Sequence, residues 1–290
     1  LSSLFGLFII GFLILSHLIL PPERLTPMLV GMANDNLNAR LDCDRIELTL
    51  FSTFPNIGLR VVNGTLLSKA SRSEEISDSS LVLTTDSLLH FDECIASIKP
   101  FDYLLMNKVA IHELRVVNPF MYAHVNDRGE ANWDILPEDT TQTETVLPQI
   151  DLEGVRVING SIFYDNDQDT VFMAMHGANL YLQGAMKDGS TAAYIDYNMG
   201  SFEYMDPINI FSTQQRIGFT TYLELDKEAI NYVLRNAKLS INALNMEMSG
   251  LVTRPDSVGD MRMDVEFGLA TDNLTELMNL VPNTLFDHSQ

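Results

Sequence analysis

Apolar and polar residues alternate along much of the chain after residue 45, which is the pattern of β-strands with one buried face. The first clear case is residues 45–50, where Ile46, Leu48 and Leu50 alternate with polar residues. The longest case is residues 261–269, whose apolar positions are Met261, Met263, Val265, Phe267 and Leu269 and whose other positions are Arg262, Asp264, Glu266 and Gly268. The pattern predicts a mainly β fold with a few short helices.

The first twenty residues differ because they are apolar throughout. Residues 1–20 contain no Asp, Glu, Lys or Arg, and a helix of that length is about 30 Å long, the thickness of a bilayer's hydrocarbon core. Pro21 and Pro22 would end such a helix. A cleaved signal peptide has a shorter apolar stretch, of about 7 to 15 residues, and no small-residue cleavage pattern follows Leu20. We therefore predict one transmembrane helix over residues 1–20, preceding the sheet.

Shorter helices are predicted at three other places. Thr26 and Pro27 have the residue types of a helix N-cap and first helical position, so a helix is expected from there to about residue 37. Asp226 is expected to cap a short helix that carries Val233 and Leu234. A last helix is expected over residues 271–282, where apolar residues recur at helical spacing.

A six-residue pattern occurs three times, at residues 59–64, 114–119 and 155–160, and reads apolar–Arg–Val–apolar–Asn–(Gly or Pro). Asparagine tolerates unusual backbone angles, and the following Gly or Pro bends or ends a strand. We therefore predict a repeated β unit whose arginines are edge or cross-strand charges, with chance similarity of short β-rich strings as the alternative. The equivalent positions are Arg60 and Asn63, Arg115 and Asn118, and Arg156 and Asn159.

Residues 137–149 have a different composition from the segments on either side. They read PEDTTQTETVLPQ and offer almost nothing to bury, which predicts an exposed linker or long loop. The chain is therefore expected to consist of a first β unit over residues 21–136 and a second β segment over residues 150–290, which we expect to continue beyond Gln290.

The charge of the chain excludes one class of partner. The 39 acidic and 18 basic residues give a formal net charge of −21, so the protein should repel nucleic acid and anionic bilayer surfaces. The two cysteines, Cys43 and Cys94, match no metal or redox spacing. They could pair in an oxidising compartment or be two buried thiols.

Motifs for catalysis or metal binding are lacking in the sequence. Residues 165–169 begin like a calcium loop, but Thr170 occupies the glycine position and no glutamate follows at the twelfth, so a solvated hairpin turn is expected. The histidines show no HExxH spacing, and there is neither a Gly-x-Ser-x-Gly elbow nor a phosphate loop. We expect no enzymatic activity, no catalytic residue, no cofactor and no metal.

The string Asp127–Leu136 contains Gly-x-Ala-Asn-Trp-Asp, with Gly129, Asn132, Trp133 and Asp134 at its fixed positions. Together with the apolar N-terminus, Leu25-Thr-Pro27 and the residues 45–55 that lead into the first repeat, this string resembles the AsmA-like family of envelope proteins. The resemblance covers nearly the whole chain and is specific in residues 1–136. Within the string, Trp133 is expected to be buried and to close the end of the first β unit, with its indole N–H donating a hydrogen bond to a carbonyl.

The resemblance implies a Gram-negative inner-membrane protein, held by residues 1–20, with most of the chain in the periplasm. It also implies a long curved antiparallel sheet, a repeating β-groove related to bridge-like lipid transfer proteins. Such a groove would bind phospholipid or another membrane lipid and pass it between the inner and outer membranes in support of outer-membrane biogenesis. About 16 strands at about 4.8 Å spacing make a groove on the order of 80 Å long, less than a bridge needs.

Two other functions stay open at this point. The first is a structural or assembly factor for outer-membrane proteins that transports nothing, with a periplasmic or outer-membrane protein as partner. The second, more distant, is an envelope hydrolase. The candidate groove residues, for which ordinary core packing is the alternative, are Met261, Met263, Val265, Phe267 and Leu269 with Met246 and Met248.

Overall fold

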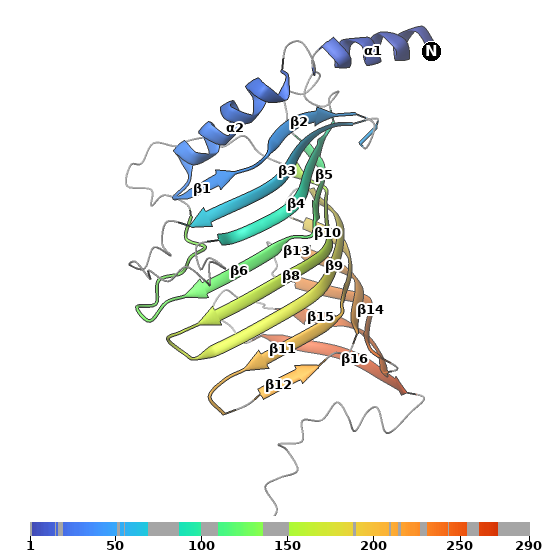
Figure 1. Ribbon diagram of the computed structural model, residues 1–290. Coiled ribbons are helices and arrows are strands. Elements are labelled where there is room, and N and C mark those ends of the chain that lie inside the picture. Colours follow the sequence, from blue (N-terminus) through green and yellow to red (C-terminus); the bar gives the residue numbers. More distant parts are fainter. Residues whose placement is uncertain are drawn as a thin grey trace, which may run out of the picture. The chain divides into compact units, whose positions relative to one another are not determined.

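The computed structural model describes residues 2–14, 16, 20–50, 53–54, 56–68, 87–99, 110–135, 151–187, 190–208, 210–213, 216–226, 231–242, 244–253 and 261–271 (Figure 1). The chain divides into two compact units. Unit 1 comprises Leu1–Leu152 and Ile162–Gln168, and unit 2 comprises Glu153–Ser161 and Asp169–Gln290. The predicted linker over residues 137–149 and most of the predicted last helix lie outside the described residues.

Helix α1 (Ser2–Ile14) contains 13 residues, so at about 1.5 Å per residue it is about 20 Å long. The hydrocarbon core of a bilayer is about 30 Å thick. Among the residues that the structure describes, no helix is long and apolar enough to cross a membrane. The prediction of a transmembrane helix over residues 1–20 is therefore wrong.

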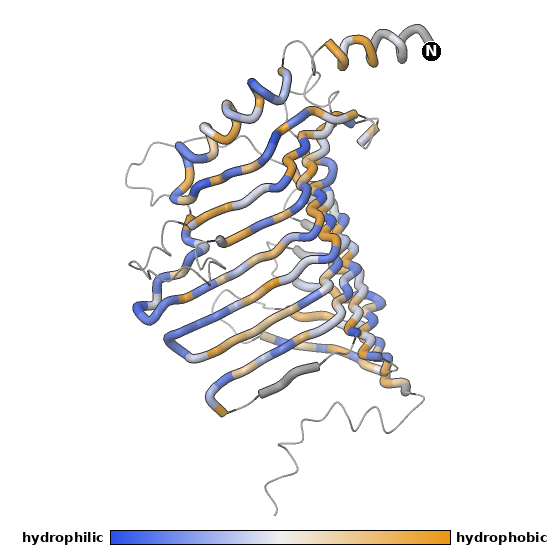
Figure 2. The backbone as a smooth tube through the Cα atoms, in the orientation of Figure 1, coloured by the Kyte–Doolittle hydropathy of each residue, from blue (hydrophilic) through white to orange (hydrophobic). Residues whose placement is uncertain are grey.

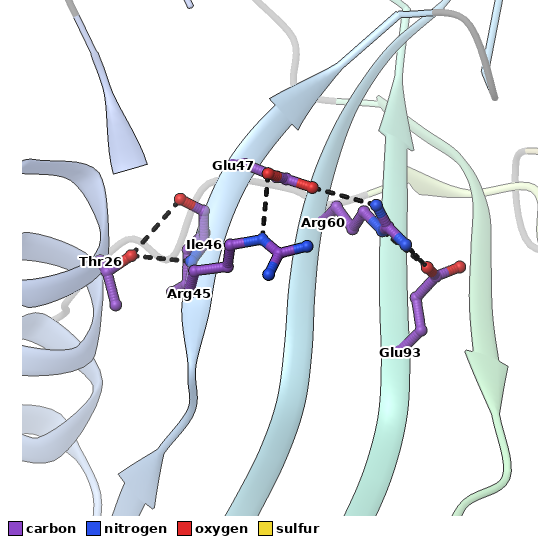
Figure 3. A network of polar contacts seen from close by, with 6 residues as sticks. All are labelled: Thr26, Arg45, Ile46, Glu47, Arg60 and Glu93. Atoms are coloured by element: carbon purple, nitrogen blue, oxygen red, sulfur yellow. Dashed lines mark hydrogen bonds and ion pairs between the residues drawn. The ribbon is translucent and has the colours of Figure 1, made fainter. Parts of the chain in front are cut away.

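Helix α2 (Pro22–Asn36) begins earlier than the sequence predicts, at a proline that suits the first helical turn. Its N-cap is Pro21, whose carbonyl accepts hydrogen bonds from the N–H groups of Arg24 and Leu25. Thr26 lies inside the helix, and its hydroxyl accepts the N–H of Ile46 at 2.7 Å and donates to the carbonyl of Ile46 at 3.4 Å (Figure 3). The prediction that Thr26 caps the helix is wrong, because Thr26 lies within α2 and its hydroxyl bonds the backbone of β2.

Helix α2 closes the edge formed by strands β1 (Ala39–Asp42) and β2 (Arg45–Thr49), which both pair with β3 (Ile57–Ser68) on their other side. The side chain of Asn34 hydrogen-bonds both backbone groups of Leu41 in β1, as the side chain of Thr26 does with those of Ile46 in β2. Its amide nitrogen donates to the Leu41 carbonyl at 3.1 Å, and its amide oxygen accepts the Leu41 N–H at 2.6 Å. Because an edge strand with free N–H and C=O groups invites pairing with another chain, α2 protects unit 1 from such pairing.

We expect Thr26→Val to lower the free energy of unfolding by about 1–2 kcal/mol, because valine keeps the shape but leaves the Ile46 N–H without its partner. Urea denaturation measures the loss. Thr26→Ser is the matched control, since it keeps the hydroxyl, and it should cost less than half as much. A loss in Thr26→Ser with none in Thr26→Val would mean that the methyl group, and not the hydroxyl, holds the helix to the strand.

The other antiparallel strands of unit 1 are β4 (Ser87–Ile98) and β5 (Ala110–Val117), and the strand order is β1-β3-β4-β5. Strand β6 (Phe120–Val125) also pairs with β4. The alternation predicted for residues 45–50 is confirmed, because Ile46 and Leu50 are buried. The core of this unit also contains Leu25, Leu88, Phe91 and Ile95.

The prediction of an antiparallel sheet throughout is wrong, because unit 1 also contains parallel neighbours. Strand β7 (Asp151–Leu152) pairs with β5 in parallel. Strand β6 lies beside β8 (Gly154–Asn166), and side chains of the two strands meet at a constant separation of 43 residues, as in parallel strands. Residues 126–150 lie between β6 and β7 in the chain and are long enough for the crossover that parallel pairing requires.

The main path of the sheet in unit 2 runs through six strands in the order β9-β10-β13-β14-β15-β16, and every neighbouring pair is antiparallel. Strand β11 (Ser201–Met205) pairs with β9 and with β12 (Ile210–Thr213). All described elements of unit 2 are strands. The bounds of the six are Val171–Lys187, Ser190–Met199, Ile217–Asp226, Asn231–Ile241, Leu244–Thr253 and Arg262–Thr271.

Val233 and Leu234 lie in β14, so the helix predicted after Asp226 is wrong at these residues. Their backbone groups are used in ladders with β13 on one side and β15 on the other. This pairing outweighs a weak local helix preference, because tertiary contacts routinely override propensity. Residues 167–170 form the expected turn between β8 and β9.

Candidate functional site

The predicted groove residues of β15 and β16 lie on one face of the sheet. The register places Met246 opposite Leu269 and Met248 opposite Phe267, and it places Val265 opposite Gly250. Residues that are directly opposite in antiparallel strands project from the same face. Six of the seven predicted groove residues are therefore neighbours, and the seventh, Met261, immediately precedes β16.

The same face continues across the six strands from β9 to β16 named above, because the register of each neighbouring pair places apolar positions opposite one another. We call this set the apolar face. Its residues are Leu180, Leu182 and Gly184 of β9; Ala193, Ile195, Tyr197 and Met199 of β10; Ile217, Phe219, Thr221 and Leu223 of β13; Tyr232, Leu234, Ala237, Leu239 and Ile241 of β14; Leu244, Met246, Met248, Gly250 and Val252 of β15; and Met263, Val265, Phe267 and Leu269 of β16.

A β-bulge in β14 keeps the apolar face continuous. The register shifts between Leu234 and Ala237, and Asn236 has a positive φ of 50°. The bulge puts two residues between Leu234 and Ala237, so both of these side chains stay on the apolar face although they are three positions apart. Thr221 is a buried hydroxyl residue of this face, and its hydroxyl donates to the Arg235 carbonyl of the bulge at 3.4 Å.

Large apolar side chains of this face are exposed at the β16 end. Met263 is 70% exposed and Phe267 is 73% exposed. Further into the sheet most residues of the face are half-buried, and Ala237 and Leu244 are buried. Contiguous exposed apolar surface of this kind marks a site for an apolar partner.

Tyr197 is a half-buried polar group on the apolar face. Its hydroxyl contacts the sulfur atoms of Met199 at 3.3 Å and Met175 at 3.6 Å. Burial raises the pKa of the Tyr197 phenol above its ordinary value of 10.0, so the hydroxyl stays neutral at physiological pH. A neutral hydroxyl with thioether partners is compatible with an apolar ligand.

The residues that alternate with the apolar face along these strands are mostly polar, and Figure 2 shows the alternation of hydropathy along the chain. Arg235 pairs with Glu224 at 3.1 Å, and Lys238 pairs with Glu247 at 3.2 Å. Such exposed pairs contribute little to stability, but they keep this face solvated. The two faces of the sheet therefore differ in the partners they can accept.

Arg60, in the first repeat, is a cross-strand charge. Its guanidinium donates to Glu47 of β2 at 3.0 Å and to Glu93 of β4 at 2.6 Å, and so it bridges both neighbours of β3 (Figure 3). Arg45 donates to the same Glu47 at 3.2 Å. The hydrogen bond to Glu93 is the main cause that raises the pKa of Arg60. This network is structural and points to no ligand.

The other two repeated arginines have different partners. Arg115 donates to Glu113 of its own strand at 2.9 Å. Arg156 lies over the ring of Tyr181, with its guanidinium carbon 4.6 Å from the ring centroid, which is a cation–π arrangement. The three arginines thus occupy equivalent sequence positions but are not brought together into one site.

The repeated asparagines share an unusual backbone conformation. Asn63, Asn118 and Asn159 have φ values of 49°, 48° and 54°, and asparagine tolerates this left-handed region better than most residues. The side chains of Asn63 and Asn118 each donate to an aspartate, Asp44 and Asp92, at 2.5 Å. The repeat therefore places an asparagine in the left-handed conformation within β3, directly after β5 and within β8.

The glycine after the first repeated asparagine is required by close packing. A Cβ atom at Gly64 would lie 2.1 Å from the Phe91 ring of the neighbouring strand. The ring thus covers the glycine, a cross-strand arrangement that compensates for its missing side chain.

In the family-like string, the buried anchor is Asn132 and not Trp133. Asn132 is 2% exposed, and its amide oxygen accepts the His124 N–H at 2.9 Å while its amide nitrogen donates to the Tyr122 carbonyl at 2.8 Å. Trp133 is 38% exposed and has its ring 6.2 Å from that of Tyr164. The prediction of a buried tryptophan is therefore wrong.

The remaining two residues of the string are Gly129, which lies in its turn, and Asp134, which follows the turn. Gly129 has a positive φ of 79°, which favours glycine. The side-chain oxygen of Asn126 accepts the N–H groups of Arg128 and Glu130, both at 2.9 Å, and so closes the turn. Asp134 is exposed, and these residues form no binding site.

Cys43 and Cys94 are free thiols and both are half-buried. Burial, with a smaller effect of the Glu93 charge, raises the pKa of Cys94 to about 11. Burial and the nearby Asp42 and Asp44 charges also raise the pKa of Cys43. Because the thiolate is the reactive form, neither residue has the character of a redox or catalytic cysteine.

Comparisons of the chain with models of protein families, with characterised proteins and with solved structures find no match. The resemblance to AsmA-like proteins therefore rests on the sequence motifs alone. The function has to be argued from the apolar face.

Proposed function

We propose that this protein binds membrane lipid, such as phospholipid, by laying acyl chains on the apolar face of unit 2. The observation that supports the proposal is the continuity of that face over six strands, with large side chains exposed at β16. The motif resemblance to AsmA-like proteins supports a setting in the Gram-negative envelope, where such a protein would help to pass lipid toward the outer membrane.

The dimensions of the apolar face suit acyl chains. Six strands at about 4.8 Å spacing span about 24 Å, and ten residues of strand extend about 34 Å. One acyl chain reaches across half of the roughly 30 Å hydrocarbon core, or about 15 Å. More than one chain could therefore lie side by side on the face.

The chemistry of the face also favours acyl chains over a specific small molecule. Acyl chains need apolar contact and no directed hydrogen bond, and the hydroxyl of Thr221 is already bonded within the sheet. Met246, Met248 and Met263 supply flexible, polarizable side chains that adapt to chains of varied shape. We therefore expect lipid binding with little selectivity for acyl-chain type.

Photo-crosslinking tests this proposal. A photoreactive residue at Met263 or Phe267 should capture phospholipid in envelope extracts, whereas one at Asp264, which projects from the polar face, should not. Mass spectrometry of the adducts and of co-purifying lipid identifies the ligand. Adducts with protein alone at both Met263 and Phe267 would contradict lipid binding and favour a structural or assembly role.

A further inference from the structure

Three side-chain pairs connect β6 to the part of β8 that belongs to unit 1 and to the turn after it. The rings of Phe120 and Phe163 have centroids 5.0 Å apart. The Tyr122 hydroxyl donates to Asp165 Oδ2 at 2.9 Å, and His124 Nε2 lies 2.9 Å from Asp167 Oδ2. The pairs change from apolar to polar toward the turn, and the last two bring one imidazole and two carboxylates together.

We propose that His124, Asp165 and Asp167 bind a divalent transition-metal ion of the Zn²⁺ type. One ligand atom from each of the three residues lies within 4.8 Å of the other two. Zn²⁺ ligands lie about 2.0–2.2 Å from the ion in a tetrahedral arrangement, which places two of them roughly 3.4 Å apart. The carboxylates would turn toward the ion to reach that separation.

The donor set distinguishes this cluster from a group of surface carboxylates. An imidazole nitrogen with carboxylate oxygens suits Zn²⁺, whereas Ca²⁺ and Mg²⁺ prefer oxygen ligands alone. Two neighbouring carboxylates repel each other, and a divalent cation would neutralise both charges. The formal net charge of −21 adds to the attraction for a cation.

The surrounding residues hold the ligands in place. The Tyr122 hydroxyl bonds Asp165, and the Tyr122 ring stacks on the His124 ring with an interplanar angle of 17°. The Asp167 N–H donates to the Val125 carbonyl at 2.9 Å, which fixes the start of the turn. The His124 side chain is 16% exposed, so the ion would be partly shielded and still reachable. Partners that orient the ligands in this way are typical of metal sites.

The sequence gives no sign of this site, because His124 and Asp167 are 43 residues apart and are brought together by the pairing of β6 with β8. The expectation of no metal followed from local spacing alone. Residues 165–169 lack the calcium-loop pattern, but they supply two ligands of a site that takes its third from another strand.

Calorimetric titration of the purified full chain with Zn²⁺ tests the proposal. The variants His124→Gln, Asp165→Asn and Asp167→Asn should each weaken binding at least tenfold. Asp127→Asn and Asp134→Asn, which change exposed carboxylates near the site, are matched controls and should bind as the wild type does. At a Zn²⁺ concentration of about a hundred times Kd, Tm should rise by about 5 °C in the wild type and the controls only.

The proposal fails if the three variants bind Zn²⁺ as tightly as the wild type, or if Ca²⁺ binds equally well, because both results describe general attraction to acidic surface. Circular dichroism of the metal-free variants checks their fold. If a variant does not fold, Co²⁺ titration of the wild type decides: selective paramagnetic broadening of the His124 ring signals supports the site, and unchanged His124 signals overturn it.

Discussion

Asn132→Leu should lower the free energy of unfolding by about 2–5 kcal/mol, since it leaves two buried backbone groups without partners at about 1–3 kcal/mol each. Leucine has nearly the same shape but can neither accept the His124 N–H nor donate to the Tyr122 carbonyl. The site is 2% exposed, so water cannot replace the lost bonds. Urea denaturation followed by circular dichroism measures the change.

Trp133→Ala provides the comparison. We expect it to cost about 1–2 kcal/mol, less than the 3–5 kcal/mol typical of a fully buried large aromatic residue, because Trp133 is 38% exposed. Asn132→Asp separates the two bonds of Asn132, since it keeps the acceptor for His124 and loses the donor to Tyr122. If Trp133→Ala cost as much as Asn132→Leu, the stability of this turn would depend on the indole ring after all.

The features that could be predicted from sequence are those set by local geometry. Side chains of a strand alternate between two faces, so the pattern at residues 261–269 was enough to identify the exposed apolar positions of β16. The conformation of the repeated asparagines can also be predicted, because a residue that tolerates positive φ followed by Gly or Pro is a local signal. Asn63, Asn118 and Asn159 all adopt that conformation.

The features that could not be predicted depend on partners distant in sequence. Thr26 has the residue type of a helix cap, and only the position of β2 shows that its hydroxyl serves Ile46. Val233 and Leu234 fit a helix until β13 and β15 pair on either side. Trp133 is the more apolar residue of its string, yet the backbone of β6 requires the amide of Asn132 and leaves the indole half-exposed.

Replacing Met263 and Phe267 together with glutamate should reduce bound lipid by on the order of a hundredfold and leave folding almost unchanged. Both side chains are at least 70% exposed, so in the empty protein the carboxylates stay in water and the free energy of unfolding should change by less than about 0.5 kcal/mol. An acyl chain on the face would remove that water, which costs about 1–3 kcal/mol for a neutral polar group and more for an ionised carboxylate. A cost of about 1.4 kcal/mol lowers the affinity tenfold, so two carboxylates that each cost at least that much lower the affinity for lipid at least a hundredfold.

Leu251→Glu is the matched control, because Leu251 is an exposed apolar residue of β15 that lies opposite Asp264 on the polar face. It adds one carboxylate to the same sheet, as Met263→Glu alone does, and should leave lipid binding unchanged. Quantitative mass spectrometry of lipid bound to each purified variant, beside its urea denaturation curve, gives both quantities. If Met263→Glu lowered the free energy of unfolding by several kcal/mol, the apolar face would be a closed core. If the double variant kept all of its lipid, the lipid would bind elsewhere. Because Leu251→Glu and Met263→Glu add equal charge and differ in the face that carries it, a loss of lipid in Met263→Glu and the double variant but not in Leu251→Glu indicates contact between lipid and the apolar face.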